Sequence, residues 1–505
     1  MTVAVTNRFV QAGLVALVEL SLCLVRLRDA YDIFIDEVTY TRIASSLAQG
    51  DGLTLDGQPF NLHPPAVLAL LGAATKVFGL NGDLESQLLA LRPMSAVFGA
   101  LACAGTYLIV ERAAGKRYAL AAAALLGLSP FVVLYNSEVM LEAPTQAATV
   151  ALFGFLAAAT WASSPTRRQW CIGLAGLFGG ITVCSKETFG LVVVVVLLVL
   201  LATGWVLPRR PIAAVLAMTA TGYAIYVVAV GVAMGFSSWW QAKYGGALRL
   251  IGADQQTGFN AATTHVSFLS RVVANATTNG ATYALLALGS LATLGLVWRF
   301  RPWRPAWRSE ATPRERVGLL VALWGLAASA YLAYAIAFGT LEAQMFYIMI
   351  FPAAAAVCVW VSGRLPSWGR LGQRACVAIL LVALVAQGGA WVAVHTRPAG
   401  AYQQFLAWEP THLPHGSVIS VTEDTAQFLV QGAVLGDWHT LADLKAHKVD
   451  YVLLSTVLVD QGYGTATKSF QAVLDTHATL LFESTRQGGG SLRLYCVCTP
   501  YFTVL

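Results

Sequence analysis

The chain is a succession of long apolar runs separated by short polar segments. With a window of about 19 residues, runs of spanning length lie at 9–27, 92–111, 118–135, 143–162, 171–185, 188–207, 211–234, 281–298, 317–338, 345–362 and 374–395. A membrane-spanning helix needs about 20 apolar residues. The pattern therefore predicts an all-α polytopic membrane protein with about 11 transmembrane helices. A further apolar stretch, 64–80, is short and contains Lys76, so we expect an interfacial or re-entrant helix there.

The composition agrees with a membrane protein. Hydrophobic residues make up 57% of the chain, charged residues only 11%, and the mean hydropathy is +0.64. Soluble globular domains carry about 25% charged residues, so the composition excludes this class. The first apolar run lacks the small-residue cleavage site of a signal peptide, and we expect it to be retained as a span.

The charges between the runs predict the orientation. If the N-terminus is cytoplasmic, every inside loop is basic, as the positive-inside rule requires. Those loops contain Arg112, Lys116, Arg117, Arg167, Arg168, Arg209, Arg210, Arg299, Arg301, Arg304, Arg308, Arg314, Arg316, Arg364, Arg370 and Arg374. Acidic residues gather on the opposite side, in 28–91, 235–280 and 339–344. Topology in a plasma membrane thus explains the net charge of +6, which gives no sign of a nucleic-acid partner.

The last part of the chain changes character. Short β-branched or apolar runs at 417–421, 451–455 and 491–497 alternate with helical patterns at 402–408, 441–447 and 469–476. This alternation predicts a small α/β domain at 396–505, outside the membrane, after a transmembrane catalytic domain at 1–395. We expect the three glycines at 488–490 to form a hairpin turn, because no Lys-Ser/Thr follows them as in a phosphate loop.

The cysteines indicate no disulfide framework. Six of the eight lie in apolar runs, and only Cys496 and Cys498 lie in a polar region. A single residue separates this pair, so a bond between them is predicted to be strained and improbable. We predict neither a disulfide nor a metal knuckle.

The first long polar stretch contains an adjacent Asp36-Glu37 and a His63-Pro64-Pro65 sequence. An amphipathic helix is predicted from Asp36 to the glycine at position 50. A purely structural interpretation is available, in which Asp36 is the N-cap, Glu37 favours the helix dipole and His63 precedes a Pro-Pro helix start.

Further ionisable residues lie in predicted turns on the same side of the membrane. Glu138 and Glu142 are four residues apart, Lys186-Glu187 separates two apolar runs, and Tyr347 begins the tenth span. Ionisable groups at such positions are expensive and indicate a functional site by default. The alternative is a set of helix caps and snorkelling pairs, such as Lys186 with Glu187 or Glu142.

These motifs resemble a known family. The sequence DEVTYTRIASSLAQGDGL followed by FNLHPP is similar to the first exoplasmic loop of the protein O-mannosyltransferase and aminoarabinose-transferase superfamily, polytopic glycosyltransferases of the GT-C fold. The resemblance extends over roughly 8–395 through an acidic turn after the third span, Lys186 and an aromatic tenth span. Asn136-Ser137 stands where many relatives have an Arg, Glu142 where Asp is commoner, and Phe346-Tyr347 where Arg-Tyr is frequent.

The resemblance implies an inverting glycosyltransferase that moves a sugar from a polyprenyl-phosphate donor to an acceptor hydroxyl on the exoplasmic face. The donor sugar is left open between mannose and a pentose, and the acceptor between a protein, a glycolipid and a cell-envelope polysaccharide. A secondary transporter or flippase for a lipid-linked sugar is the alternative. A non-catalytic receptor would leave the acidic and HPP motifs without a purpose.

Chemistry then assigns roles to the candidate residues. Asp36 is the predicted general base. His63 and Lys186 are predicted to stabilise the leaving phosphate, with a hydroxyl from Tyr347, and Glu37 and Glu142 to orient the acceptor or sugar. A monophosphate leaving group requires no metal or other cofactor, although an acid-and-His cluster could bind a divalent ion. We predict no metal site.

Overall fold

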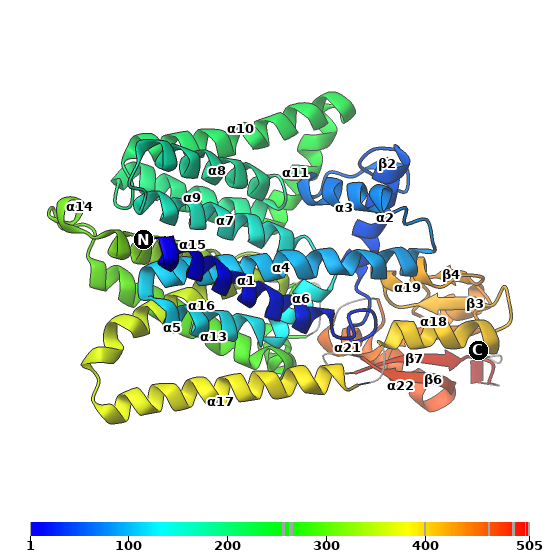
Figure 1. Cartoon of the computed structure of the whole chain (residues 1–505). Coiled ribbons are helices and arrows are strands. Elements are labelled where there is room, and N and C mark those ends of the chain that lie inside the picture. The colour runs from blue at the N-terminus through cyan, green and yellow to red at the C-terminus, as the bar shows by residue number, and fades with distance from the viewer. Residues whose placement is uncertain are drawn as a thin grey trace.

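The computed structural model describes residues 2–254, 258–261, 266–397, 400–462, 465–486, 490–499 and 501–502. A bundle of long helices forms most of it (Figure 1). The bundle consists of α1 (Thr2–Leu24), α4 (Leu84–Ala114), α5 (Lys116–Gly127), α6 (Pro130–Ser137), α7 (Glu142–Thr160), α8 (Pro165–Val183), α9 (Glu187–Thr203), α10 (Arg209–Met234), α13 (Ala276–Phe300), α15 (Pro313–Ala337), α16 (Gln344–Arg364) and α17 (Arg370–His395). The predicted all-α membrane architecture is confirmed.

Each predicted apolar run contains a helix. Judged by length and composition, however, fewer than 11 of these helices could cross a membrane. Among the described residues, eight helices are long and apolar enough to cross a membrane, or up to nine if the bent pair α5 and α6 forms one span. The pair is bent by 64°, and α9 is a shorter apolar helix. The predicted count of 11 spans is therefore not confirmed.

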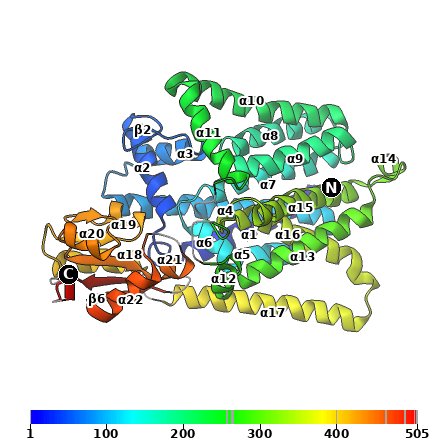
Figure 2. The same ribbon diagram turned by 180° about the vertical axis from the view of Figure 1, so that it is seen from behind.

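The helices differ in how deeply they lie in the bundle. The most apolar windows of α16 and α4 are 72% and 61% buried, whereas that of α17 is only 6% buried. Figures 1 and 2 show α17 running beside the bundle with most of its surface uncovered. The helices α4, α7, α15 and α16, whose apolar windows are 61% to 72% buried, therefore form the centre of the bundle.

The first polar loop contains α2 (Ile35–Gln49), the short strands β1 (Thr54–Leu55) and β2 (Gln58–Pro59), and α3 (Ala66–Val77). The predicted amphipathic helix is present, and Gly50 ends it with a φ of 95°, a left-handed conformation that glycine adopts without steric cost. The N-cap is Phe34, so the expectation that Asp36 caps the helix was wrong. Asp36 is the second helical residue, and the Glu37 carboxylate accepts from the Phe34 N–H at 3.4 Å.

The remaining loops add α11 (Phe236–Leu250), α12 (Phe268–Ala274), α14 (Trp307–Glu310) and the 3-10 helix η1 (Leu365–Ser367). In both Figure 1 and Figure 2, α2, α3 and α11 lie at the end of the bundle that carries the C-terminal sheet. We refer to this as the sheet end. The first loop and α11 thus meet at one end of the membrane bundle.

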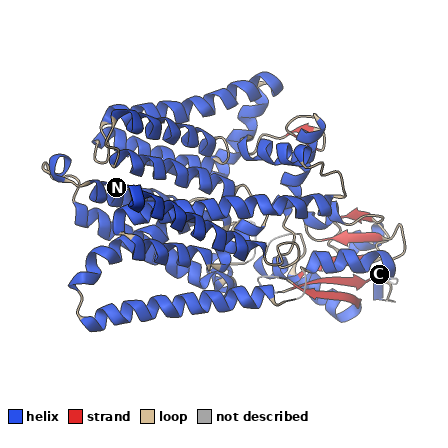
Figure 3. Cartoon of the chain, in the orientation of Figure 1, coloured by secondary structure: helices blue, strands red, loops and turns tan. Residues whose placement is uncertain are grey.

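The C-terminal segment forms a small α/β domain, as predicted. Its strands are confined to the sheet end (Figure 3). They are β3 (Val418–Val421), β4 (Val434–Gly436), β5 (Tyr451–Ser455), β6 (Thr479–Thr485) and β7 (Ser491–Cys496), in the order β4-β3-β5-β7-β6. The helices are α18 (Ala401–His412), α19 (Asp424–Leu429), α20 (Leu441–Ala446), α21 (Thr456–Gln461) and α22 (Lys468–His477).

The sheet is mixed. Strand β3 pairs in parallel with β4 and β5, while β7 pairs antiparallel with β5 and β6. The antiparallel β6–β7 pair is the hairpin expected around the glycines, although two of those glycines, at 488 and 489, lie outside the described residues.

One cysteine prediction was wrong. Cys496 and Cys498 form a disulfide. Cys496 is the last residue of β7, and the chain leaves the strand so that the two Cα atoms lie 5.3 Å apart, within the usual range for a disulfide. The spacing in sequence did not reveal this local path of the backbone.

Candidate active site

Three elements meet around Asp36 at the sheet end. Glu142 is the first residue of α7, and Lys186 is the N-cap of α9. The Lys186 ammonium forms an ion pair with Glu142 Oε1, and their side chains are 7% and 0% exposed. Lys186 Nζ also donates to Gln344 Oε1 at 2.9 Å. The predicted snorkelling pair is therefore present, but it lies inside the protein.

Asp36 differs from Glu142, Glu187 and Glu342 because its carboxyl has no partner in the described part of the chain. It is partly exposed and makes no hydrogen bond or ion pair within the described part of the chain. Removal from water raises its pKa to about 7, and Lys186 opposes this rise more strongly than any other charge. The carboxyl is thus able to gain or lose a proton near neutral pH.

His63 lies in the same environment. The Ala66 N–H donates to the Cys184 carbonyl at 2.8 Å, which fastens the HPP sequence to the end of α8. The His63 ring lies 6.1 Å from that of Tyr40, centroid to centroid. Burial, together with the nearby cation Lys186, lowers the His63 pKa well below its usual value. The lowered pKa favours the neutral imidazole over the cation expected from the sequence.

The helix α11 contributes two cations that the sequence reasoning missed. Lys243 forms an ion pair with Glu187, and its Nζ donates to the Leu62 carbonyl at 3.2 Å, next to His63. Arg249 Nη2 lies 2.6 Å from Glu342 Oε1. Both residues lie in 235–280, on the side of the membrane where acidic residues predominate. Basic residues are the exception on that side, and this exception could have marked them as candidates from the sequence.

Hydrogen bonds and ion pairs connect five members of this set of polar side chains directly. Gln344 Nε2 donates to Glu342 Oε2 and so joins the pair Lys186–Glu142 to the pair Arg249–Glu342. We call the set the outer cluster. It consists of Asp36, His63, Glu142, Lys186, Glu187, Lys243, Arg249, Glu342 and Gln344. Each of its three cations already has a carboxylate partner, and Glu142 Oε2 is buried without a hydrogen-bond partner.

Glu37 has a different environment from its neighbour. Its oxygens accept from Arg92 Nε at 3.0 Å, from Arg92 Nη2 at 2.8 Å and from the Val139 N–H at 2.7 Å. Both side chains are 0% exposed. Arg92 also donates to the carbonyls of Leu27, Tyr31 and Asp32. We call the Glu37–Arg92 pair the loop anchor, because it fixes both ends of the segment that leads into α2.

Tyr347 is used in the interior of the bundle. Its hydroxyl donates to Asn136 Oδ1, and Asn136 Nδ2 donates to Glu19 Oε1 at 2.9 Å. Tyr347 is 0% exposed. Glu138 is also separate from Glu142, because α6 ends at Ser137 and Glu138 is extended. The structure therefore brings Asp36, His63, Glu142 and Lys186 together, whereas the carboxylate of Glu37 and the hydroxyl of Tyr347 are engaged elsewhere.

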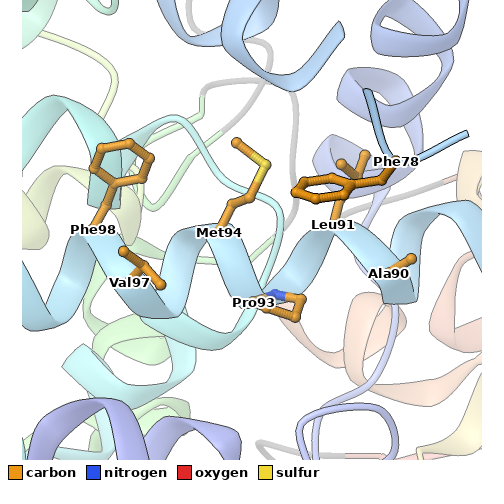
Figure 4. Close-up of a pocket in the computed structure, with 7 residues that line it drawn as sticks. All are labelled: Phe78, Ala90, Leu91, Pro93, Met94, Val97 and Phe98. Carbon is orange, nitrogen blue, oxygen red and sulfur yellow. The ribbon is translucent and has the colours of Figure 1, made fainter. Parts of the chain in front are cut away.

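A hollow of about 420 Å³ lies along α4 beside the end of α3 (Figure 4). It is lined by Phe78, Ala90, Leu91, Pro93, Met94, Val97 and Phe98. This lining contains no ionisable group, so the hollow suits a hydrocarbon chain and offers no base or cation.

The side chains of the outer cluster do not form a set of metal ligands in the described part of the chain. Within the described residues, no group of three or more His, Cys, Asp and Glu side chains is arranged to hold a metal ion. Two of the acids nearest Asp36, Glu142 and Glu342, are paired with Lys186 and Arg249. The residues present thus fit an anionic ligand better than a divalent cation.

Comparisons with known proteins agree with this architecture. The sequence model of the family described as dolichyl-phosphate-mannose-protein mannosyltransferase matches residues 62–234. No curated protein sequence matches the chain. The structure resembles the oligosaccharyltransferase AglB from Archaeoglobus fulgidus, solved with an inhibitory peptide and a dolichol-phosphate, with a TM-score of 0.57 at 12% identity over 96% of this chain and 74% of AglB.

A second solved structure is similar over almost the whole length of both proteins. ArnT from Cupriavidus metallidurans, bound to undecaprenyl phosphate, has a TM-score of 0.53 at 15% identity and covers 97% of this chain and 98% of ArnT. The fold is that of the GT-C membrane glycosyltransferases. The family model that matches residues 62–234 agrees with the resemblance of the first polar loop to the protein O-mannosyltransferase and aminoarabinose-transferase superfamily.

Proposed function

We propose that the protein is an inverting glycosyltransferase that uses a polyprenyl-phosphate sugar and works at the exoplasmic face of the plasma membrane. The observation that carries the proposal is the unpartnered Asp36 carboxyl near Lys186 and Arg249, with a third cation, Lys243, near His63. AglB and ArnT, which share the fold, were solved with polyprenyl phosphates. A base next to a phosphate-binding group is what this reaction requires.

The proposed reaction is one in-line displacement. The acceptor hydroxyl loses its proton to Asp36, the acceptor oxygen forms a bond to the anomeric carbon, and the bond from that carbon to the lipid phosphate oxygen breaks. The electron pair of the broken bond stays on the phosphate. A general base is most effective when its pKa lies near the working pH, and that of Asp36 is about 7.

The leaving lipid phosphate gains negative charge as the bond breaks. Lys186 and the two cations of α11 lie where they could stabilise that charge, which in a dry site is worth far more than in water. Neutral His63 can donate one hydrogen bond to a phosphate oxygen. The orphan Oε2 of Glu142 is available to a substrate hydroxyl. Glu37 keeps α2 in place, and we assign it a positioning role instead of the substrate contact predicted from the sequence.

The substrate classes follow from this chemistry. The donor is a polyprenyl-phosphate hexose or pentose, and the acceptor is a hydroxyl of a protein, a glycolipid or a polysaccharide of the cell envelope. The family description, which names a mannosyltransferase acting on protein, makes mannose the first donor to test. No step of the displacement calls for a metal.

The test is a reconstitution in proteoliposomes with radiolabelled polyprenyl-phosphate mannose and, in parallel, the corresponding pentose donor. Covalent transfer of label to an acceptor fraction by the wild type, and no transfer by Asp36→Asn, is expected. Movement of intact donor across the bilayer without transfer would instead identify the protein as a transporter. Equal transfer by both proteins would remove Asp36 from the mechanism.

A further inference from the structure

The carboxyl ends of the parallel strands β3 and β5 lie next to the first polar loop, because Arg486 at these ends contacts Asp32. From β3 the chain passes through α19 to β4 on one side, and then through α20 to β5 on the other side of β3. The parallel strands β3 and β5 therefore flank a topological switch point. In open α/β sheets this crevice at the carboxyl ends of the strands is where ligands bind. Here it contains a side chain that joins the sheet to the first polar loop.

That side chain is Arg486, which follows β6 and is 9% exposed. Its Nη1 donates to Glu423 Oε2 at 2.8 Å and to Ser455 Oγ at 2.7 Å, the residues at the ends of β3 and β5. Its Nε donates to Asp32 Oδ2 at 2.8 Å. Asp32 belongs to the segment before α2. A single guanidinium thus occupies the crevice and holds the loop.

Further hydrogen bonds connect Asp32 to the residue next to the candidate base Asp36. Asp32 Oδ1 accepts from the Tyr402 N–H at 3.0 Å, and the Asp32 carbonyl accepts from Arg92 Nη2 at 3.0 Å. The same nitrogen of Arg92 donates to Glu37, the neighbour of Asp36. A continuous chain of hydrogen bonds therefore runs from Arg486 to the start of α2.

A second contact supports α2 farther along. The Arg42 guanidinium lies 4.1 Å above the ring of Phe428 on α19. The domain thus holds α2 near its beginning and at its middle. The first contact comes from Arg486, which follows β6 and fills the crevice, and the second comes from α19, which follows β3, so the sheet and α2 are expected to move as one body.

We propose that Arg486 is a positioning residue for glycosyl transfer, which holds the start of α2 through Asp32 so that Asp36 stays where the acceptor hydroxyl must lie. This inference rests on the proposed function. Charges buried in this way must keep tight geometry, because an unpaired buried charge is strongly unfavourable. A base displaced by about 1 Å can lose about 100-fold in rate.

The test compares Arg486→Gln with Arg493→Gln. Arg493 lies on β7 of the same domain and also pairs with two carboxylates, Glu483 at 2.8 Å and Asp475 at 3.2 Å, but not with the loop. We expect kcat per folded enzyme to fall about 100-fold in Arg486→Gln, with KM for the donor nearly unchanged. Arg486→Lys should recover part of the loss, and Arg493→Gln should match the wild type.

A pH profile separates positioning from simple loss of folded protein. Loosening of α2 admits water to Asp36, so the acidic limb of kcat should move to lower pH in Arg486→Gln. The groups facing Asp36 that could contribute to this limb are Lys186, Glu142, Glu342, Arg249, Glu138, Tyr40 and Tyr135. None of them is altered in either variant. An unchanged limb together with unchanged kcat would overturn the proposal.

Hydrogen–deuterium exchange gives a readout that does not depend on the reaction. Amide exchange across residues 32–40 should rise in Arg486→Gln and remain at the wild-type level in Arg493→Gln. If Arg486→Gln does not fold, Asp32→Asn replaces it, because the amide retains the oxygen that accepts from Tyr402. No transfer by the wild type refutes the proposed function, whereas unchanged exchange at 32–40 refutes the role of Arg486.

Discussion

Asp36 and Glu37 are adjacent in the sequence and have opposite environments. Glu37 is fully buried and accepts three hydrogen bonds from Arg92 and the Val139 N–H. Asp36 is partly exposed, and its carboxyl makes no such contact in the described structure, although three cations lie in the outer cluster. The Glu37–Arg92 pair fixes the start of α2, whereas the carboxyl of Asp36 in the outer cluster remains without a partner in the described chain.

The difference shows how one short motif can combine structure and chemistry. A bidentate Arg–carboxylate pair fixes orientation as well as position. Because consecutive helical residues point about 100° apart, the same turn that directs Glu37 toward Arg92 directs Asp36 toward a different side. Rigid support for one carboxylate thus allows the other to remain unpaired without the loop collapsing onto it.

The largest effect expected is that of Asp36→Asn. The amide cannot accept the hydroxyl proton, so transfer should fall by about 10³-fold or more, in the range of general-base catalysis. Folding and membrane insertion should be unaffected, because Asp36 supports no other group. The measurement is kcat/KM of purified enzyme in proteoliposomes, with thermal stability recorded on the same sample.

The matched control is Asp51→Asn, an exposed acid that follows α2 in the same loop. Its activity should equal that of the wild type. If the two variants lost activity to the same extent, the comparison between a reactive and a structural carboxylate would not hold.

In contrast to Asp36→Asn, the substitution Glu37→Gln should lower stability more than it lowers the activity of the folded enzyme. It leaves Arg92 buried with an uncompensated charge, and removal of one partner of a buried pair costs about 3 to 5 kcal/mol. We expect a clear drop in the unfolding midpoint, measured by dye-based thermal denaturation in detergent. Activity should fall in proportion to the folded fraction, whereas a large loss in fully folded protein would give Glu37 a direct part in the reaction.

Removal of cations from the outer cluster should have smaller, graded effects. Lys186→Ala removes a buried donor and should lower kcat by about 10²-fold, the usual loss for one group that stabilises developing charge. Lys243→Ala should lower it less, because its side chain is 16% exposed whereas that of Lys186 is 7% exposed. The affinity of each variant for a donor analogue with a phosphonate head group would measure how much each cation contributes to donor binding. Equal, small losses would place the phosphate elsewhere.

The pH dependence should show the raised pKa of Asp36. A base must be deprotonated to act, so activity is present above its pKa and is lost as the pH falls through it. With a pKa of about 7, kcat/KM should be about tenfold lower at pH 6 than on the alkaline plateau. A profile that stays flat down to pH 5 would contradict the assignment of Asp36 as the base.

The sequence predicted the helices well because their signal is local. Every apolar run contains a helix, α2 ends at the predicted Gly50, and the three predicted strands of the C-terminal domain coincide with β3, β5 and β7, whereas β4 and β6 were not predicted. The number of spans was not predicted as well, because length and hydropathy do not show that α5 and α6 bend by 64°. The disulfide Cys496–Cys498 depends on how the backbone leaves β7.

The site was predicted in part. Asp36, His63, Glu142 and Lys186 could be found because each is an ionisable group in a loop or turn of an apolar protein. Their partners could not, because Arg92 and Glu37 are 55 residues apart and meet only through the packing of α2 on α4. The neutral state of His63 likewise depends on burial, which the sequence does not show.

Tyr347→Phe should have the smallest effect on activity. It tests whether the Tyr347 hydroxyl belongs to the outer cluster or to the interior of the bundle. The substitution keeps the ring and removes one hydroxyl, which donates to Asn136. Loss of a single buried hydrogen bond costs about 1 kcal/mol, so the unfolding midpoint should fall slightly. Because the hydroxyl is engaged inside the bundle, kcat/KM should stay within about twofold of the wild type. A hundredfold loss of kcat in a stable protein would mean that the hydroxyl turns toward the substrate, and the outer cluster would then have to include Tyr347.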